Sequence, residues 1–351
     1  MRILHLLNHT RRLNGHVHAA IDLACAQREL GHEVLIASGG GDFDALLARC
    51  GVETLVLNHH RSLPVLSATA LRLRRILSTR RIDVVHAHMM TSAVIAAPIC
   101  ALQRVPLITT VHNAFERSAV LMGLGRRVIA VSEAVAASMR GRGVPASRLT
   151  VVLNGTIGTA RSRGRSVQPA DIARPAVVFV GGLHARKGVS DLIAAFAQIQ
   201  GKHPAARLHI VGGGPSMDEY VAAARKMGSA ETIIFHGPKD DPYPYMLAAD
   251  IFILPSHADP APLVLSEARE AGAAIIGTRV DGIPQLLEEG EAGILVPARD
   301  VGALADAIDR LLANRNDLEM WRARSQTRLD RLTIARVARE TLEVYQSAGA
   351  R

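Results

Sequence analysis

Aromatic residues are scarce in this sequence, since phenylalanine, tryptophan and tyrosine together make up 3% of its 351 residues. Proteins that hold single-stranded nucleic acid stack successive bases on aromatic side chains. The scarcity argues against such stacking, and no nucleic-acid partner is expected. Cysteine is rare as well, and the three cysteines form no C-x-x-C pair. This pattern is typical of buried thiols in a reducing compartment.

Long apolar runs and the common nucleotide signatures are also missing. No stretch reaches the roughly 18 to 20 uncharged residues that a membrane span needs. The first ten residues, MRILHLLNHT, predict a strand rather than a secretion signal, and we expect a cytoplasmic protein. Neither a P-loop nor a G-x-G-x-x-G turn occurs, so a nicotinamide cofactor is not supported.

Lysine is absent from the first 170 residues, which hold 21 arginines against 9 acids and carry a formal charge of +12. Residues 171–351 hold 20 basic residues against 23 acids and carry −3. A basic half suits nucleic acid, an anionic membrane surface or an anionic substrate. A general arginine bias that serves solubility explains it equally well.

Short apolar runs alternate with helical patterns along the whole chain. Strands are predicted at residues 2–7, 33–37, 54–57, 83–88, 106–112, 127–132 and 149–153, and again at 176–181, 207–212, 232–237, 251–256, 273–278 and 293–296. They are rich in valine and isoleucine without polar alternation, which is typical of parallel strands covered on both faces by helices. The sequence therefore predicts an α/β protein with two Rossmann-like, doubly wound domains facing a central cleft.

A polar stretch, TARSRGRSVQPADIARP at residues 159–175, separates the two series and predicts a linker. We expect one domain at residues 1–165 and a second at 166–332, with a C-terminal helix at 333–351 that could pack back onto the first. Residues 304–345 are predicted to be helical throughout.

Ligands of such sheets bind at the carboxyl ends of the strands, beside helix N-termini. In the second half, Arg186 and Lys187 follow a glycine turn at the mouth of a helix that begins near Val189. This arrangement predicts a phosphate or diphosphate site. Solvated basic residues at a turn are the alternative.

The run PSHADPAPLVLSEAREAG places Asp259 in a loop before a helix that begins near Leu263, and Glu267 just over one turn inside that helix. Carboxylates accept hydrogen bonds from hydroxyls, while free N–H groups of a helix mouth receive an anion. A ligand with a diphosphate and many hydroxyls, such as a nucleotide sugar, suits both. The alternative is that Asp259 caps the helix and Glu267 is a surface acid.

The first half offers fewer candidates. Asn14 and Gly15 precede a helix at the first strand exit, where a polar acceptor could dock, and His112 follows another strand, where a purely structural hydrogen bond is the alternative. His86 and His88 have the spacing of metal ligands but lack adjacent acids, so no metal site is expected there.

Several stretches of the second half, taken in order, resemble the retaining glycosyltransferases of the GT-B fold, group 1 or family 4. They are GGLHARKGVSDLIAAF, IVGGGP, FHG, AADIFILPS, the D-x7-E pair, GTRVDGIPQLL and GILV. The first half is similar to the same family at DVVHAH, TVHN, AVSEAVAASM and RLTVVLNG, so the resemblance covers nearly the whole chain. It implies an acceptor-side first domain and a donor-binding second domain. It also implies transfer of a hexosyl group from a nucleotide-diphosphate-sugar co-substrate without a metal or other cofactor. The resemblance also suggests a sugar or a lipid-linked acceptor, as in envelope glycan or glycolipid synthesis.

The resemblance also implies roles for individual residues. Lys187, helped by Arg186, would stabilise the diphosphate, Asp259 would face sugar hydroxyls and Glu267 the ribose. The remaining donor-side positions are the backbone of Ala261, Pro262, Leu263 and Val264 along the sugar and diphosphate, and Gly237 and Pro238 beside the base. On the acceptor side, His112 would lie beside the transferred sugar, and Asn14, Gly15 and His16 would form the loop between donor and acceptor.

Two residues depart from the family pattern. Asp259 is one methylene shorter than the usual glutamate, and Gly182 stands where a diphosphate arginine is expected, so Arg186 is the nearest substitute. Two other functions therefore stay open. One is a GT-B protein that binds a nucleotide sugar without catalysis, and the other is a sugar-nucleotide 2-epimerase of the same fold.

Residues 68–81, ATALRLRRILSTRR, place Leu73, Ile76 and Leu77 on one stripe of a helix that is flanked by arginines. Such a stripe either packs on its own sheet or docks reversibly on an anionic bilayer. The second case would bring the protein to the inner face of the membrane as a peripheral enzyme.

Overall fold

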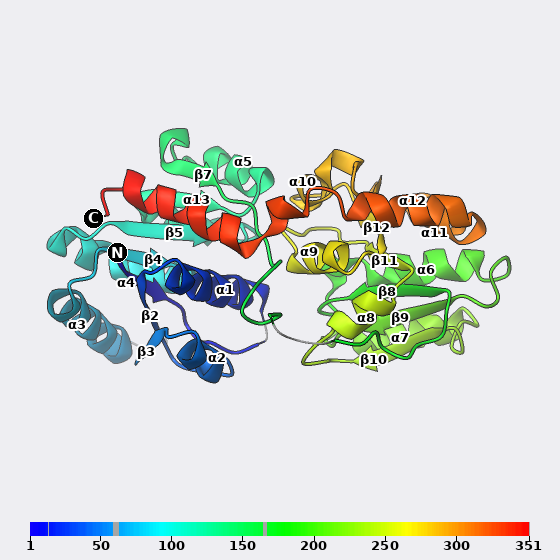
Figure 1. Ribbon diagram of the computed structural model, residues 1–351, viewed down its shortest axis with the longest axis horizontal. Coiled ribbons are helices and arrows are strands. Elements are labelled where there is room, and N and C mark those ends of the chain that lie inside the picture. Colours follow the sequence, from blue (N-terminus) through cyan, green and yellow to red (C-terminus); the bar gives the residue numbers. More distant parts are fainter. Residues whose placement is uncertain (13, 59–62, 164–166, 351) are drawn as a thin grey trace. The chain divides into compact units, whose positions relative to one another are not determined.

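The computed structural model describes every residue except 13, 59–62, 164–166 and 351. Its contacts divide the chain into two compact units (Figure 1). Unit 1 consists of Met1–Arg163 and Asp330–Arg351, and unit 2 of Gly164–Leu329. Unit 1 is therefore built from two separated stretches of sequence, whereas unit 2 is continuous. The domain boundary that the sequence predicts, between residues 165 and 166, lies outside the described residues.

Unit 1 contains a parallel sheet whose described strands follow the order β3-β2-β1-β4-β5-β6-β7. The strands are β1 Arg2–Leu6, β2 Glu33–Ser38, β3 Glu53–Val56, β4 Val84–Ala87, β5 Leu107–Val111, β6 Arg127–Ala130 and β7 Leu149–Val151. The helices are α1 Gly15–Glu29, α2 Asp44–Arg49, α3 Leu63–Arg80, α4 Met90–Gln103, α5 Glu133–Gly141 and α13 Ile334–Ser347, with 3-10 helices η1 Arg117–Leu124 and η2 Ala146–Arg148.

Unit 2 repeats the design with the described strand order β10-β9-β8-β11-β12-β13, again all parallel. The strands are β8 Ala176–Val180, β9 Arg207–Val211, β10 Ile233–Gly237, β11 Ile251–Leu254, β12 Ala274–Thr278 and β13 Ile294–Val296. The helices are α6 Val189–Ile199, α7 Met217–Lys226, α8 Tyr243–Ala248, α9 Leu263–Glu270, α10 Ile283–Leu286, α11 Val301–Ala313 and α12 Arg315–Ser325, with 3-10 helices η3 Ala185–Lys187, η4 Glu288–Gly290 and, at the join to unit 1, η5 Leu329–Leu332. In both sheets the order reverses beside the first strand, so the prediction of two doubly wound, Rossmann-like domains is confirmed.

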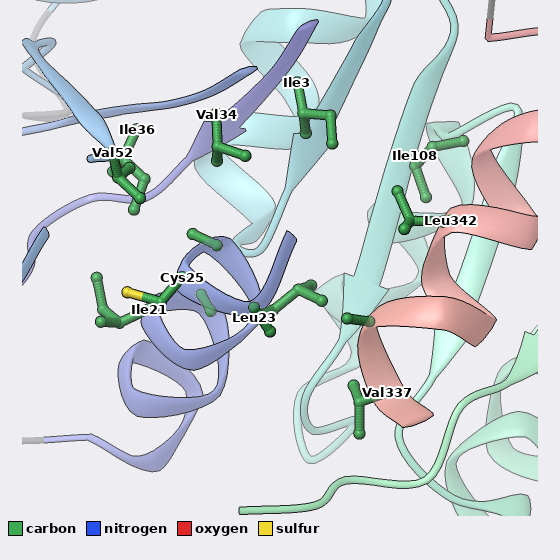
Figure 2. Packing of buried hydrophobic residues seen from close by; sticks show 14 of the residues in the cluster. Ile3, Ile21, Leu23, Cys25, Val34, Ile36, Val52, Ile108, Val337 and Leu342 are labelled. Carbon is green, nitrogen blue, oxygen red and sulfur yellow. The ribbon is translucent and has the colours of Figure 1, made fainter. Parts of the chain in front are cut away.

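Helix α13 belongs to unit 1 because it completes the apolar core there. It packs on α1 and on β6 (Figure 1). Figure 2 shows Val337 and Leu342 of α13 in the same buried cluster as Ile21 of α1 and Ile3 of β1. Burying each such side chain stabilises the fold by roughly 1.5 to 3 kcal/mol.

The prediction of one uninterrupted helix over residues 304–345 is wrong. Asn314 has an extended backbone and its side chain accepts the N–H groups of Asn316 and Asp317, which ends α11 and caps α12. A second break follows α12, and Thr333 then caps α13 by accepting the N–H of Arg336. Side-chain oxygens that satisfy free N–H groups start each new helix.

The apolar stripe of α3 is buried within unit 1. Leu73, Ile76 and Leu77 are all covered, whereas Arg74 and Arg75 are exposed. Of the two alternatives, the stripe therefore packs within unit 1 and does not dock on a bilayer, while the arginines and Leu71 of α3 are exposed. No helix of the described residues combines the length and the apolar character needed to cross a bilayer.

Candidate active site

Strand exits meet closely at the carboxyl edge of the unit 2 sheet. Gly212 has φ +142, and a Cβ there would lie 1.9 Å from the carbonyl oxygen of Gly181. Gly188 has φ +65, and a Cβ there would lie 2.0 Å from the carbonyl oxygen of Pro255. The N–H of Gly212 donates to the carbonyl of Gly237 over 2.9 Å. Only glycine permits this approach, which joins the loops after β8, β9, β10 and β11.

Lys187 and Asp259 form a nearly buried ion pair on this edge. Lys187 Nζ donates to Asp259 Oδ2 over 2.5 Å, and the two side chains are 11% and 8% exposed. Ser256 Oγ donates to the same carboxylate oxygen over 3.2 Å. The N-cap of α9 is Pro262, which excludes the alternative that Asp259 caps this helix. The sequence predicts both residues as site candidates but does not predict their contact.

Asp281 supports this loop and was missed by the sequence analysis. Its Oδ2 accepts the backbone N–H of Asp259 over 2.6 Å, and Gly282 N–H donates back to the Asp259 carbonyl over 3.3 Å. Burial raises the pKa of Asp281, and the nearby charge of Asp259 adds to the rise while the hydrogen bond opposes it. An Asp-Gly pair directly after a strand was the available signal.

Helix α9 begins at Leu263, as the sequence predicts, and carries Glu267 on a partly exposed position. Burial raises the pKa of Tyr243 to about 12, and the charges of Glu270 and Glu267 add to that rise. Burial likewise raises the pKa of Glu270, with Glu267 again contributing. Glu267 therefore lies in a region of negative potential, which suits hydroxyl donors rather than phosphate.

The remaining donor-side residues occupy the same edge. Ala261 and Pro262 are buried, while Leu263 and Val264 open α9 and are partly buried. Pro238 follows the turn at Gly237 and lies 3.4 Å from where a Cβ of Gly213 would be.

Arg186 is exposed and donates to the Ala258 carbonyl over 3.3 Å. The position beside Gly182 is taken by His184, whose ring carbon lies 3.1 Å from where a Cβ of Gly182 would be. The ring of His184 therefore lies beside the position where the family pattern places an arginine, and no sequence pattern predicts this.

Unit 1 has its own cavity of about 210 Å³ at the carboxyl ends of β4 and β5. His112 and His16 lie on its wall with ring centroids 5.9 Å apart. Asn8 Oδ1 and His16 Nε2 are buried there and have no hydrogen-bond partner among the described residues. Burial lowers the pKa of His16 to about 4 and that of His112 to about 3. Orphaned polar atoms on neutral side chains suit a hydroxylated ligand.

Asn14 and Gly15 are exposed at the start of α1, where Asn14 is the N-cap but makes no side-chain cap bond. The structure therefore brings His16 to His112, while Asn14 and Gly15 do not line the cavity. Asn8 was missed, because a lone asparagine two residues beyond a strand is a weak signal.

Two groups in unit 1 resemble metal ligands. His5, His86 and His88 offer ligand atoms within 4.8 Å of one another, but both ring nitrogens of each already make hydrogen bonds. Asp42 and Asp44 form a D-x-D pair after β2; Asp42 accepts from the N–H of Arg12 and Asp44 from Thr10 Oγ1. Hydrogen bonds within the fold therefore account for both groups.

Comparison with protein families gives two matches. Residues 13–156 match the domain described as Glycosyltransferase Family 4, and residues 174–314 match Glycosyl transferases group 1. Glycogen synthase of Mycobacterium tuberculosis is 31% identical over 327 residues, a match that covers 84% of this chain and 75% of that protein. D-inositol 3-phosphate glycosyltransferase of Acidothermus cellulolyticus is 31% identical over 66% of this chain and 59% of that protein.

Solved structures with the same fold cover almost the whole chain. HepE of Anabaena in complex with UDP has a TM-score of 0.82 at 20% identity, over 99% of this chain and 100% of that one. WaaG, a glycosyltransferase involved in lipopolysaccharide biosynthesis, has a TM-score of 0.73 at 16% identity. At these identities the likeness concerns the fold: two parallel α/β sheets in one chain.

Proposed function

This chain belongs to the group 1 glycosyltransferases of the GT-B fold, and we propose that it moves a sugar from a nucleotide diphosphate sugar to a hydroxylated acceptor with retention of anomeric configuration. The observation that carries the proposal is the Lys187–Asp259 pair at the edge of unit 2. It puts a cation for a diphosphate and a hydroxyl acceptor for a sugar side by side. The glycine turns there let the loops that carry this pair approach one another closely.

The donor chemistry follows from these groups. Charge develops on the departing nucleoside diphosphate, and a preorganised cation such as Lys187, helped by Arg186, stabilises it without a metal. Asp259 would accept from a hydroxyl of the sugar and Glu267 from the ribose. Gly237, Pro238 and the backbone of residues 261–264 would complete the donor site. HepE is solved with UDP and with UDP-glucose, so uridine donors are the first to test.

Retention follows in this proposal from departure and attack on the same face of the sugar. The bond from the anomeric carbon to the phosphate oxygen breaks, and the acceptor oxygen bonds that carbon from the side the phosphate leaves. The acceptor proton goes to the departing phosphate oxygen. Asp259 is held by Lys187 and Ser256, so it is not assigned as a nucleophile.

The acceptor is assigned to the unit 1 cavity, beside His112 and His16, with Asn14 and Gly15 at the start of the neighbouring helix. Its orphaned polar atoms, Asn8 Oδ1 and His16 Nε2, would bond hydroxyls of a sugar or a lipid-linked sugar. A cytoplasmic enzyme of glycan synthesis suits this chemistry. The exposed Arg74 and Arg75 of α3 could still add weak electrostatic attraction to an anionic membrane.

A panel of nucleotides and nucleotide sugars tests the donor. A ligand at 100 times its dissociation constant should add about 2.7 kcal/mol to the stability of the folded state, which a thermal shift detects. The bound sugar nucleotide should then be transferred or slowly hydrolysed, with the configuration of the product read by proton NMR. Binding without turnover would favour a non-catalytic binding protein, and an altered sugar nucleotide would favour the epimerase.

Two matched substitutions test the division of labour. Glu267→Gln should weaken both the sugar nucleotide and the free nucleoside diphosphate, because the ribose is common to both. Asp259→Asn should weaken only the sugar nucleotide. Equal losses for both ligands in both variants would contradict the assignment.

A further inference from the structure

Seven buried or partly buried polar side chains of unit 1 form one continuous hydrogen-bond network around Gln27. Gln27 lies on α1 and is fully buried. Its amide has one oxygen and one nitrogen, and each begins a branch. The first branch is Gln27, His5, His88 and His112, and the second is Gln27, Tyr345, His86 and Thr110.

The first branch has a fixed direction, because an amide oxygen can only accept. Gln27 Oε1 lies 2.8 Å from His5 Nε2, so that nitrogen carries the proton and His5 Nδ1 is bare. His5 Nδ1 lies 2.9 Å from His88 Nε2, which must therefore donate, leaving His88 Nδ1 bare. His88 Nδ1 lies 3.2 Å from His112 Nε2, which donates in turn.

The second branch is consistent with the same amide orientation. Gln27 Nε2 donates to Tyr345 Oη over 3.2 Å, and the hydroxyl of Tyr345 donates to His86 Nδ1 over 2.6 Å. His86 Nε2 then donates to Thr110 Oγ1 over 2.6 Å. Turning the amide over would reverse every bond on both branches, so this one side chain controls the direction of all of them.

All members must be neutral for this scheme, and their surroundings make them so. Burial lowers the pKa of His5 to about 4 and that of His112 to about 3. Burial also lowers the pKa values of His86 and His88 well below the ordinary range, and neighbouring histidines add to the effect. At neutral pH each ring therefore has one donor and one acceptor nitrogen.

We propose that Gln27, His5 and His88 are positioning residues that hold His112 in the Nε2–H tautomer, so that its bare Nδ1 is presented as a hydrogen-bond acceptor to a substrate hydroxyl. Nδ1 has no partner among the described residues, and the ring lines the unit 1 cavity. The kinetic consequence rests on the proposed function of His112 beside the transferred sugar. The prediction of the His112 tautomer does not depend on that function.

Unit 2 supplies an internal standard. His209 Nε2 donates to the backbone carbonyl of Ala173 over 3.0 Å, and His209 Nδ1 lies 3.0 Å from His236 Nε2. A carbonyl cannot turn over as an amide can, so His236 must keep the Nε2–H tautomer whatever happens at Gln27.

The test is long-range proton–nitrogen NMR on protein labelled with 15N-histidine, which distinguishes protonated from bare ring nitrogens. In the wild-type protein at pH 7, His112 should show a protonated Nε2 and a bare Nδ1, as should His236. A protonated Nδ1 on wild-type His112 overturns the proposal without any variant. Assignments come from His112→Asn and His236→Asn.

Two substitutions at Gln27 complete the test. In Gln27→Leu, His5 Nε2–H would lose its acceptor, and a buried N–H is tolerated less well than a bare acceptor. The relay should therefore reverse, His112 should become Nδ1–H, and kcat should fall about tenfold or more, the usual consequence of one misdirected hydrogen bond. Gln27→Glu keeps an oxygen that accepts from His5, so it should restore the wild-type tautomer and most of the turnover.

Several outcomes overturn the proposal. An unchanged His112 tautomer in Gln27→Leu, or a reversed one in Gln27→Glu, removes the control assigned to Gln27. A reversed tautomer with unchanged kcat removes the positioning role. If Gln27→Leu does not fold, the wild-type spectrum and Gln27→Glu still decide. Absence of any glycosyl transfer would instead count against the proposed function, since the NMR result is obtained without substrate.

Discussion

Lys187 and Asp259 depend on each other as single residues, since each nearly buried charge is compensated by the other. Removing one partner of a buried pair costs about 3 to 5 kcal/mol, because the other charge remains uncompensated. Kinetics at this pair must therefore be measured together with stability. Otherwise a loss of folded enzyme would be mistaken for a loss of catalysis.

Lys187→Ala should lower turnover on the order of 10²-fold or more, because the proposed mechanism assigns to this cation the stabilisation of the departing diphosphate. Steady-state rates normalised to folded enzyme measure this. The matched control is Lys202→Ala, which breaks an exposed pair with Asp309 in the same unit and should leave turnover unchanged. Equal effects of the two substitutions would exclude Lys187 from the site.

Gly182→Arg should tighten binding of the nucleoside diphosphate about tenfold, since a charged hydrogen bond is worth roughly 1.5 kcal/mol or more. The backbone of Gly182 is not in the left-handed region, and only the ring of His184 must shift to admit a Cβ. Calorimetric titration gives the affinity. Gly182→Gln, which is uncharged and two bonds shorter, is the control, and equal affinity in both variants would refute an electrostatic gain.

At the scale of elements, α9 is tied into unit 2 by a fully buried arginine. Arg269 donates to the backbone carbonyls of Ser325, Leu286 and Thr327, two residues along the helix from Glu267. Its guanidinium also lies near Glu288. The position of Glu267 therefore depends on a side chain that no ligand touches.

Arg269→Met should destabilise unit 2 by about 3 kcal/mol or more, because it removes the donor of three backbone carbonyls, two of them in buried hydrogen bonds, and one of the two arginines beside the buried Glu288. It should also raise the KM for the donor, since α9 loses its anchor. Denaturant titration followed by the fluorescence of Trp321, the one tryptophan of the chain, reports this. Arg310→Met, at an exposed pair with Asp317, should change neither quantity.

The alternation of strands and helices could be predicted from the sequence because buried parallel strands are apolar throughout. The place of Lys187 and Asp259 at one edge of the unit 2 sheet could be predicted too, because both lie in loops that follow strands, whereas their role toward a donor stays a prediction. The histidine network could not be predicted. His5 is paired in register with His86 across β1 and β4, 81 positions apart, and only the strand order brings them together. The contact of Lys187 with Asp259 has the same origin, as it joins loops after two neighbouring strands.

At the scale of the whole molecule, the histidines make the two units respond differently to acid. The folded pKa of His5 is about 4, below the ordinary 6.5, and those of His86, His88 and His112 are lowered as well. Between pH 4 and 6.5 the unfolded chain binds more protons than the folded one, so stability falls as pH falls through that window. His5 alone contributes on the order of 3 kcal/mol.

Unit 1 should therefore unfold before unit 2 at pH 5, whereas at pH 7.5 the difference should shrink. Far-UV circular dichroism follows both units, while Trp321 fluorescence follows unit 2 alone, since α12 belongs to it. At pH 5 the dichroism should show a urea transition that fluorescence does not. Coincident transitions at both pH values would contradict the prediction.

The split sequence of unit 1 has a consequence for the order in which the protein is made. A ribosome finishes all of unit 2 before it reaches α13, so unit 2 can fold while unit 1 still lacks its last core helix. Until then the apolar side of α1 around Ile21 has no α13 to cover it, and Gln27 has no Tyr345 to bond. The nascent chain should thus acquire a folded unit 2 first, and the side chains around His112 should become ordered only after α13 has been synthesised.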